Sequence, residues 1–157
     1  MKTLQTAPLP LLNLPPAELR VSSENGHATV LDPLRRRHVR LTPEEWVRQN
    51  FTAYLIHHLG YPAGLLANEV SLQLNGMARR CDTVLYGRDL QPRMIIEYKA
   101  PSVALTQKVF DQICRYNMVL RVGWLVVSNG LQHVCCRIHT NAGTYEFVPQ
   151  VPAYEDL

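Results

Sequence analysis

Several features that would assign the 157-residue chain to a familiar class of protein are missing from its sequence. No run approaches the roughly 18 apolar residues of a membrane-spanning helix, so we expect no membrane insertion. The pattern G-x-x-x-x-G-K-[ST] is absent, which excludes a P-loop motor. The sequence has no series of aromatic residues of the kind that stacks on the bases of single-stranded nucleic acid. With 46% hydrophobic residues, the chain can nevertheless build the core of one domain.

Cysteine occurs as Cys81, Cys114, Cys135 and Cys136, and no CxxC pair is present. The spacing of zinc ligands is therefore missing. We expect these cysteines to be reduced thiols in a cytoplasmic protein.

Lysine is scarce. The chain has only Lys2, Lys99 and Lys108, against thirteen arginines. The net charge of +3 permits a nucleic-acid partner without requiring one. The choice of lysine at position 99 is informative, because an ammonium is a compact charge whose pKa moves readily on burial.

Prolines at positions 8, 10, 15 and 16 break the apolar segment near the N-terminus, so it cannot form the helical core of a signal peptide. We expect residues 1–17 to be an extended, proline-rich arm that packs on a single domain formed by residues 18–157.

Turn and capping signals divide this domain into elements. Asn25-Gly26 lies between two strand-like runs and predicts a β-hairpin. Thr42 as N-cap, Pro43 at N1 and Glu45 at N3 predict a helix from 43 to about 59. Residue patterns predict strands at 69–74, 79–86, 93–99, 123–127, 131–140 and 144–148, and a second helix at 106–120. The order gives an α/β fold with an α-β-β-β-α-β core, a central mixed sheet flanked by helices and an added N-terminal β-hairpin.

Charged residues follow the apolar run of residues 94–96 in the segment EYKAPS. If the loop 87–92 joins two strands with Tyr86 opposite Arg93, Asp82 stands opposite Glu97, with Cβ atoms roughly 5 Å apart. Two opposed carboxylates repel unless a positive charge lies between them, and Mg²⁺ suits oxygen ligands. Lys99 shares a strand face with Glu97, where it could position an attacking water or stabilise phosphate charge. A salt bridge to lysine would satisfy the same charges without a metal.

These residues carry a family resemblance. Asp82, fourteen further residues and then Glu97-Tyr98-Lys99 resemble the D…ExK signature of the PD-(D/E)XK nuclease superfamily, whose core has the same order of elements. Between residues 10 and 148, the chain more narrowly resembles the N-terminal nuclease domain of the R (restriction) subunit of type I restriction enzymes. The segments that carry this resemblance, in order, are LTPEEWVRQNF, GYP, NEVSL, RRCD, EYKAPS, QICRYN and VSNG. The proline of the superfamily's name has no counterpart, because Arg80-Cys81 precede Asp82.

The resemblance implies a restriction-endonuclease-like fold and a metal site. Asp82 and Glu97 would be ligands of Mg²⁺, with Mn²⁺ as its substitute. Lys99 would be the catalytic lysine. Glu69 would be the additional acidic residue that holds a metal-bound water, or otherwise a surface strand residue.

The resemblance also matches Gln112 and Tyr116 to the QxxxY element on the helix after the ExK strand. As i, i+4 neighbours these two residues share a helix face, where they would orient the lysine or touch the DNA backbone. The alternative for Tyr116 is packing in the core.

The densest basic cluster is Arg35, Arg36, Arg37 and Arg40, and a second pair, Arg79 and Arg80, precedes Asp82. If the sheet brings both groups near the carboxylates, they would hold DNA phosphates. Otherwise the 35–40 group is a solvated surface.

Without a motor, the chain cannot be a whole R subunit, so we expect a nuclease-like domain alone. Its partners would be DNA and a separate motor or specificity protein. A homodimer is a further expectation, since each site makes one nick and a double-strand cut needs two.

Three functions fit the sequence. The first is a Mg²⁺-dependent DNA endonuclease in which metal-activated water hydrolyses the backbone. The second is a non-catalytic module that retains the nuclease fold and binds nucleic acid or a protein partner. The third is an ordinary α/β domain with a salt-bridged strand. Metal binding separates the first from the third, and cleavage separates the first from the second.

Overall fold

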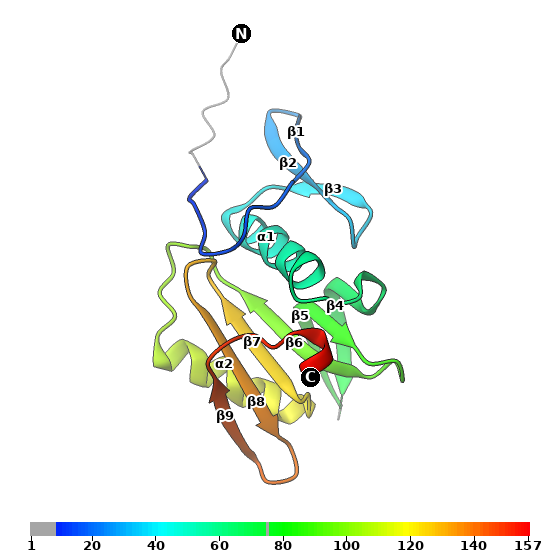
Figure 1. The fold of residues 1–157 in the computed structure, drawn as a ribbon, viewed down its shortest axis with the longest axis vertical. Coiled ribbons are helices and arrows are strands. Elements are labelled where there is room, and N and C mark those ends of the chain that lie inside the picture. The colour runs from blue at the N-terminus through cyan, green and yellow to red at the C-terminus, as the bar shows by residue number, and fades with distance from the viewer. Residues whose placement is uncertain (1–8, 75) are drawn as a thin grey trace.

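The computed structural model describes residues 9–74 and 76–157, with the side chains of residues 74, 77, 115, 116 and 118–120 outside the description. Within these residues the chain forms a six-stranded mixed sheet, a separate three-stranded sheet and two α-helices (Figure 1). The predicted α/β class and the α-β-β-β-α-β core are confirmed.

The three-stranded sheet is antiparallel and consists of β1 (Val21–Glu24), β2 (His27–Asp32) and β3 (Arg37–Arg40). The predicted hairpin is confirmed, and both turn residues adopt positive φ, 49° at Asn25 and 79° at Gly26. The strand β3 was not predicted. Its sequence RHVR offers one apolar residue, so the strand depends on pairing with β2 rather than on its own pattern.

Helix α1 (Pro43–His57) begins where the capping residues predict. The Glu45 backbone N–H donates to the Thr42 hydroxyl at 3.1 Å, which satisfies one of the free N–H groups of the first turn. The helix ends two residues before the predicted position, and Gly60 follows with φ of 75°.

The larger sheet has the strand order β4-β5-β6-β7-β8-β9. β6 and β7 are parallel because α2 (Gln107–Leu120) crosses between them, and every other neighbouring pair is antiparallel. The bounds are β4 (Leu66–Leu74), β5 (Met77–Tyr86), β6 (Pro92–Tyr98), β7 (Trp124–Ser128), β8 (His133–His139) and β9 (Thr144–Val148). β4 begins three residues earlier than predicted, and the other predicted strands differ by two residues or fewer at each end.

The two helices cover opposite faces of this sheet. Phe51 and Leu55 of α1 are fully buried against a cluster that contains Ile96 of β6. Phe110 of α2 belongs to a second cluster, which contains Ile95 of the same strand. Because alternate residues of β6 enter different clusters, this strand is buried on both faces and its charged residues lie next to the core.

The described part of the N-terminal arm packs on the domain. The Trp46 indole donates to the Pro10 carbonyl at 3.0 Å, and the Asn13 backbone N–H donates to the Gly130 carbonyl at 2.8 Å. In the described part of the chain, no helix has the length and apolar character needed to cross a membrane. All four cysteines are free and buried.

Candidate functional site

The register of the sheet places three carboxylates in one row across three neighbouring strands. Thr83 of β5 pairs with Ile96 of β6, so the next residues, Asp82 and Glu97, stand opposite each other. On the other side of β5, the pairs Asn68–Thr83 and Val70–Cys81 leave Glu69 at the position facing Asp82. Sequence spacing alone predicted this facing of Asp82 and Glu97.

The route to this register was partly wrong. Tyr86 pairs with Pro92 and not with Arg93, because the ladder shifts by one residue between Leu85 and Tyr86. The shift lies at the hairpin end, so the pairing is in the predicted register again before it reaches Asp82.

Glu69 interrupts its strand. It has a φ of 56°, in the left-handed region that a residue with a side chain seldom adopts, and it makes no ladder pair with β5. The Glu69 carboxylate accepts hydrogen bonds from Arg48 of α1 and Arg80 of β5, each at 2.5 Å. Burial raises the Glu69 pKa, but the hydrogen bonds and charges of the two arginines outweigh that effect and lower it below its ordinary value.

Asp82 and Glu97 interact directly. The Asp82 carboxylate accepts a hydrogen bond from the Tyr98 backbone N–H at 2.9 Å, which anchors it to β6. The Glu97 side chain is 10% exposed. Burial, followed by the charge of Asp82, raises the Glu97 pKa to about 8, against an ordinary value of 4.5. Near neutral pH, Glu97 therefore keeps a proton that it shares with Asp82 in a side-chain hydrogen bond.

Arginines surround this row. Arg79 donates a hydrogen bond to the Glu97 carboxyl at 2.5 Å and also to the side-chain carbonyl of Asn117 on α2. Arg48 lies 4.0 Å from the Asp82 carboxylate and 5.7 Å from the centre of the Tyr98 ring. The row is thus reached by arginines from α1 on one face and from β5 on the other.

Lys99 follows β6 directly. Its backbone N–H donates to the Ser128 carbonyl at 2.9 Å, which continues the pairing with β7. The ammonium is close enough to Glu97 to lower that carboxyl's pKa, although this effect is smaller than those of burial, Asp82 and Arg79. Among the described residues the ammonium has no hydrogen bond or ion pair, so the salt bridge expected as the alternative does not form.

Other predicted residues lie outside this row. Gln112 is on the exposed side of α2, and the side chain of Tyr116 lies outside the described part of the structure. Arg80 pairs with Glu69 and is 71% exposed, so it remains open to solvent. Arg79 is 14% exposed and its guanidinium contacts Glu97, so it supports the row of carboxylates.

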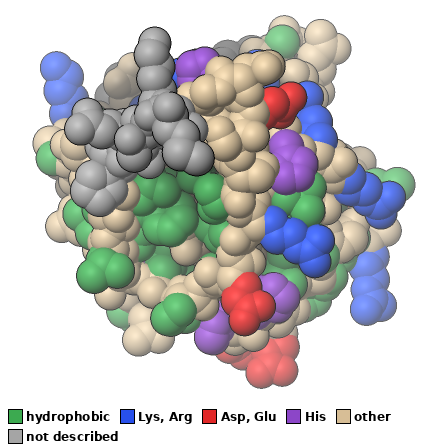
Figure 2. All heavy atoms as spheres, turned by 90° about the horizontal axis from the view of Figure 1, so that it is seen from above, with side chains coloured by type: hydrophobic (Ala, Val, Ile, Leu, Met, Phe, Trp, Pro, Cys, Tyr) green, Lys and Arg blue, Asp and Glu red, His purple; other side chains and the backbone are tan. Residues whose placement is uncertain are grey.

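The predicted basic cluster divides into two parts. Arg35 pairs with Asp32 and Glu45 and is 13% exposed, so its guanidinium holds the three-stranded sheet to α1. The exposed members are Arg36, Arg37 and Arg40. Figure 2 views the end of the molecule that carries the three-stranded sheet, and basic side chains gather on the side where β3 lies.

Sequence reasoning missed Arg48. Its guanidinium is 6% exposed and contacts Glu45, Glu69 and Asp82, which joins the helix to the row of carboxylates. The sequence around Arg48 did not indicate that this residue is buried. The hydrophobic spacing of α1 identifies only the face of the helix that packs on the core of the larger sheet. Glu45 and Arg48 are both buried, and the Arg35–Glu45 ion pair joins this flank of α1 to the turn between β2 and β3.

Two residues of the carboxylate row, Asp82 and Glu97, have the chemistry of metal ligands. Within the described residues, no three His, Cys, Asp or Glu side chains converge as a ready-made ligand set, because Glu69 is turned toward arginines. Asp82 and Glu97 do offer two oxygen ligands that share a proton at neutral pH. A hard divalent cation suits oxygen ligands and would relieve the repulsion that the proton now relieves. The chemistry of these two residues therefore fits Mg²⁺.

Comparison with known proteins places the chain in a family. Residues 43–152 match the model of the type I restriction enzyme R protein N terminus. A search of curated proteins found no match. Among solved structures, the chain is similar to a fragment described as an HsdR subunit of a type I restriction enzyme from Vibrio vulnificus YJ016.

That similarity has a TM-score of 0.53 at 19% sequence identity and covers 74% of this chain, so it concerns the fold. The matched region is 24% of the Vibrio chain, so the protein described here corresponds to a limited part of that subunit. Since the family model spans most of the domain, including all three carboxylates and Lys99, this chain belongs to the family of type I restriction enzyme R protein N termini.

Proposed function

We propose that the protein is a metal-dependent nuclease that cuts the DNA backbone. The observation that carries the proposal is the facing pair Asp82 and Glu97, with the positive charge of Lys99 two residues further along the chain and near Glu97. Asp82 and Glu97 would hold Mg²⁺ or Mn²⁺. The bound metal would supply Lewis acidity and activation of water for attack on phosphorus.

Each residue of the row has a part in this proposal. Glu97 must lose its proton to bind the cation. Burial and the charge of Asp82 oppose that loss in the metal-free protein, and the positive charge of the cation would offset both effects. Lys99 would stabilise the negative charge on the phosphate that is cut, because this half-buried residue carries its positive charge near Glu97. Glu69 would accept a hydrogen bond from a water, provided that Arg80 releases it.

The path of the DNA would follow a basic groove. A cavity of about 650 Å³ is lined by Arg37 and Arg40 of the three-stranded sheet and by Arg48, Glu69 and Arg80 of the carboxylate row. The exposed arginines would bind backbone phosphates, which gives affinity without sequence preference. The groove supports this path because it connects the basic surface with Glu69, the residue that faces Asp82.

Family membership supports a nuclease-related function and interaction with DNA. Since the chain matches a limited part of the Vibrio subunit, a separate motor or specificity protein would complete the activity. A homodimer would provide two sites for a double-strand cut.

A non-catalytic binding module is the second candidate. The observation that favours it is that arginine side chains donate to both Glu69 and Glu97, so each carboxyl group has a partner without a metal. In this case Mg²⁺ would not compete with Arg79 for Glu97, and the basic groove would serve for binding alone.

Nicking of supercoiled plasmid in Mg²⁺ or Mn²⁺ tests the proposal, with wild type beside Asp82→Asn and Lys99→Ala. We expect cleavage that EDTA abolishes and that each variant lowers by about 100-fold or more, the usual loss of one group that stabilises transition-state charge. Lys108→Ala is the matched control, because Lys108 is an exposed lysine on α2 and its loss leaves the row intact.

Calorimetric titration with Mg²⁺ separates the two candidates. Binding by wild type and not by Asp82→Asn, without cleavage, would indicate that the nuclease needs a partner or another substrate. Absence of both binding and cleavage in a folded wild type would refute the nuclease proposal and leave the binding module.

A further inference from the structure

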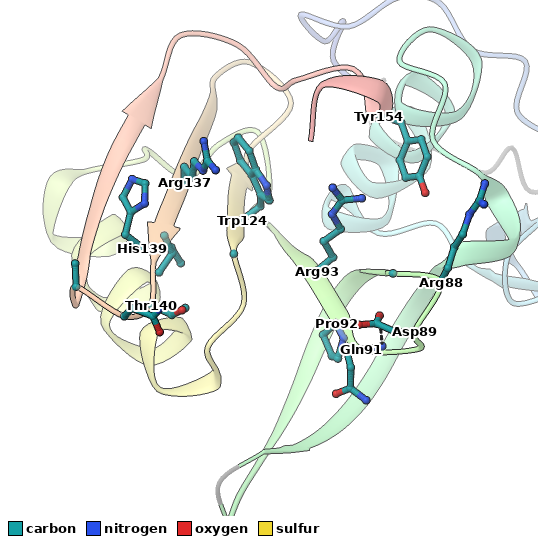
Figure 3. Close-up of a pocket in the computed structure, with 15 residues that line it drawn as sticks. Arg88, Asp89, Gln91, Pro92, Arg93, Trp124, Arg137, His139, Thr140 and Tyr154 are labelled. Atoms are coloured by element: carbon teal, nitrogen blue, oxygen red, sulfur yellow. Dashed lines mark hydrogen bonds between the residues drawn. The ribbon is translucent and has the colours of Figure 1, made fainter.

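A second basic cavity lies away from the carboxylate row. It has a volume of about 990 Å³ and is lined by the 87–93 loop, the starts of β6 and β7, the end of β8 and Tyr154 (Figure 3). It adjoins Arg93 of β6. At the rise per residue of a β-strand, Arg93 lies about 13 Å along β6 from Glu97. Trp124 and Tyr154 pack on the cluster under α1, whereas Glu97 connects through Arg79 to Asn117 of α2. The cavity and Glu97 thus differ in both strand end and sheet face.

Three guanidinium groups line this cavity without an Asp or Glu partner in the described part of the chain: Arg88, Arg93 and Arg137. The acidic side chain in the lining is Asp89, which accepts a hydrogen bond from the Gln91 backbone N–H at 3.1 Å and so belongs to its own loop (Figure 3). The cavity therefore holds an excess of positive charge, which favours an anionic ligand.

Aromatic rings hold two of these guanidiniums in place. The Arg137 guanidinium lies 5.7 Å from the centre of the Trp124 ring, and that of Arg93 lies 5.9 Å from the centre of the Tyr154 ring. Arg93 also donates to the Leu157 carbonyl at 2.7 Å. Each guanidinium keeps further N–H donors, so two positioned forks are available to one ligand.

Tyr154 is itself fixed to the domain. Its backbone N–H donates to the Leu59 carbonyl at 2.9 Å, and its ring lies 5.8 Å from that of Tyr61. The Tyr61 hydroxyl donates to the Pro152 carbonyl at 2.9 Å. The cavity wall is consequently ordered before any ligand arrives, which reduces the entropy lost on binding.

We propose that this cavity is a nucleotide-binding site, in which arginines hold a phosphate and a base stacks on the aromatic and guanidinium planes. Arginine forks match phosphate geometry, and base stacking on aromatic side chains is the usual companion of such contacts. The volume is at the upper end of small-ligand pockets and admits a nucleotide. The nucleotide is either free or part of a strand.

Fluorescence of Trp124 tests the proposal. The chain has two tryptophans, so a Trp46→Phe background leaves Trp124 as the sole reporter. The titrants are 5′-AMP, a ten-nucleotide oligothymidylate, and adenosine as the ligand without phosphate. EDTA is present throughout, so the result is independent of cleavage and of the metal proposal.

We expect saturable quenching by a phosphate-bearing ligand and much weaker quenching by adenosine. Arg88→Ala and Arg137→Ala, at exposed positions that tolerate substitution, should each raise Kd by about tenfold. Arg20→Ala is the control for loss of charge, since Arg20 is exposed and outside the cavity. If oligothymidylate binds at least tenfold more tightly than AMP, the ligand is a strand. If the two affinities are closer than that, the ligand is a free nucleotide.

Absence of saturable quenching by both phosphate ligands at millimolar concentration would overturn the proposal. It would also be overturned by adenosine binding as tightly as AMP, or by Arg20→Ala weakening binding as much as Arg137→Ala does.

Discussion

Replacement of Glu97 by glutamine should change how the stability of the metal-free protein depends on pH. Glu97 is buried beside Asp82 and its pKa is raised to about 8, while its ordinary value is 4.5. The unfolded chain therefore releases the Glu97 proton at a lower pH than the folded protein does. Stability attributable to this residue is greatest below pH 4.5 and is lost as the pH rises through 8.

The size of the effect follows from the two pKa values. Between them, each pH unit costs ~1.4 kcal/mol of unfolding free energy, and above the folded pKa the loss levels off. From pH 6 to pH 9, wild type should therefore lose ~3 kcal/mol relative to Glu97→Gln, which has no proton to release. For a domain of this size, that difference corresponds to about 6–12 °C in Tm.

Urea unfolding in EDTA at pH 6, 7, 8 and 9 measures this difference. The loss of the Arg79 pair shifts the Glu97→Gln values at every pH, so the comparison uses the change with pH and not the absolute stability. Glu24→Gln in β1 is the matched control, because Glu24 is exposed and should follow the wild-type profile. Parallel profiles for wild type and Glu97→Gln would refute the inference that Glu97 is protonated beside Asp82 at neutral pH.

Three further variants test the fold by urea unfolding. Thr42→Ala removes the N-cap bond to the Glu45 N–H and should lower the unfolding free energy by ~1 kcal/mol. Leu90→Gly should raise it by ~0.5 kcal/mol, since relief of the left-handed φ of 62° at a 73% exposed residue exceeds the entropy cost of glycine. Phe51→Ala should lower it by about 3–5 kcal/mol, because the ring is fully buried against Tyr98.

These variants have their own controls. Leu131→Gly, at an exposed position without positive φ, should destabilise the protein, and stabilisation there would contradict the explanation for Leu90. Thr140→Ala, at an exposed turn position, should leave stability nearly unchanged. A loss below about 1 kcal/mol for Phe51→Ala would contradict the described core.

Local sequence patterns determined most of the elements. The capping residues Thr42 and Glu45 fixed the start of α1, and Asn25-Gly26 fixed the first hairpin, because each signal acts through neighbours in the chain. The facing of Asp82 and Glu97 was predicted from an assumed pairing of Tyr86 with Arg93. That pairing was wrong, and the one-residue shift between Leu85 and Tyr86 is what brings the strands into the predicted register. The strand β3 was not predicted, because one apolar residue in RHVR carries too little pattern.

Only the tertiary structure decided the surroundings of these carboxylates. Arg48 reaches Glu69 from another element, and Arg79 pairs with Glu97 across a strand pair, contacts that no short-range pattern encodes. The cavity of Arg93 and Arg137 likewise joins residues from separate strands with a ring near the C-terminal end. The sequence by itself determined which charges follow the core of β6. Their pKa values and partners depend on burial and on distances between segments far apart in the chain, and folding alone sets these.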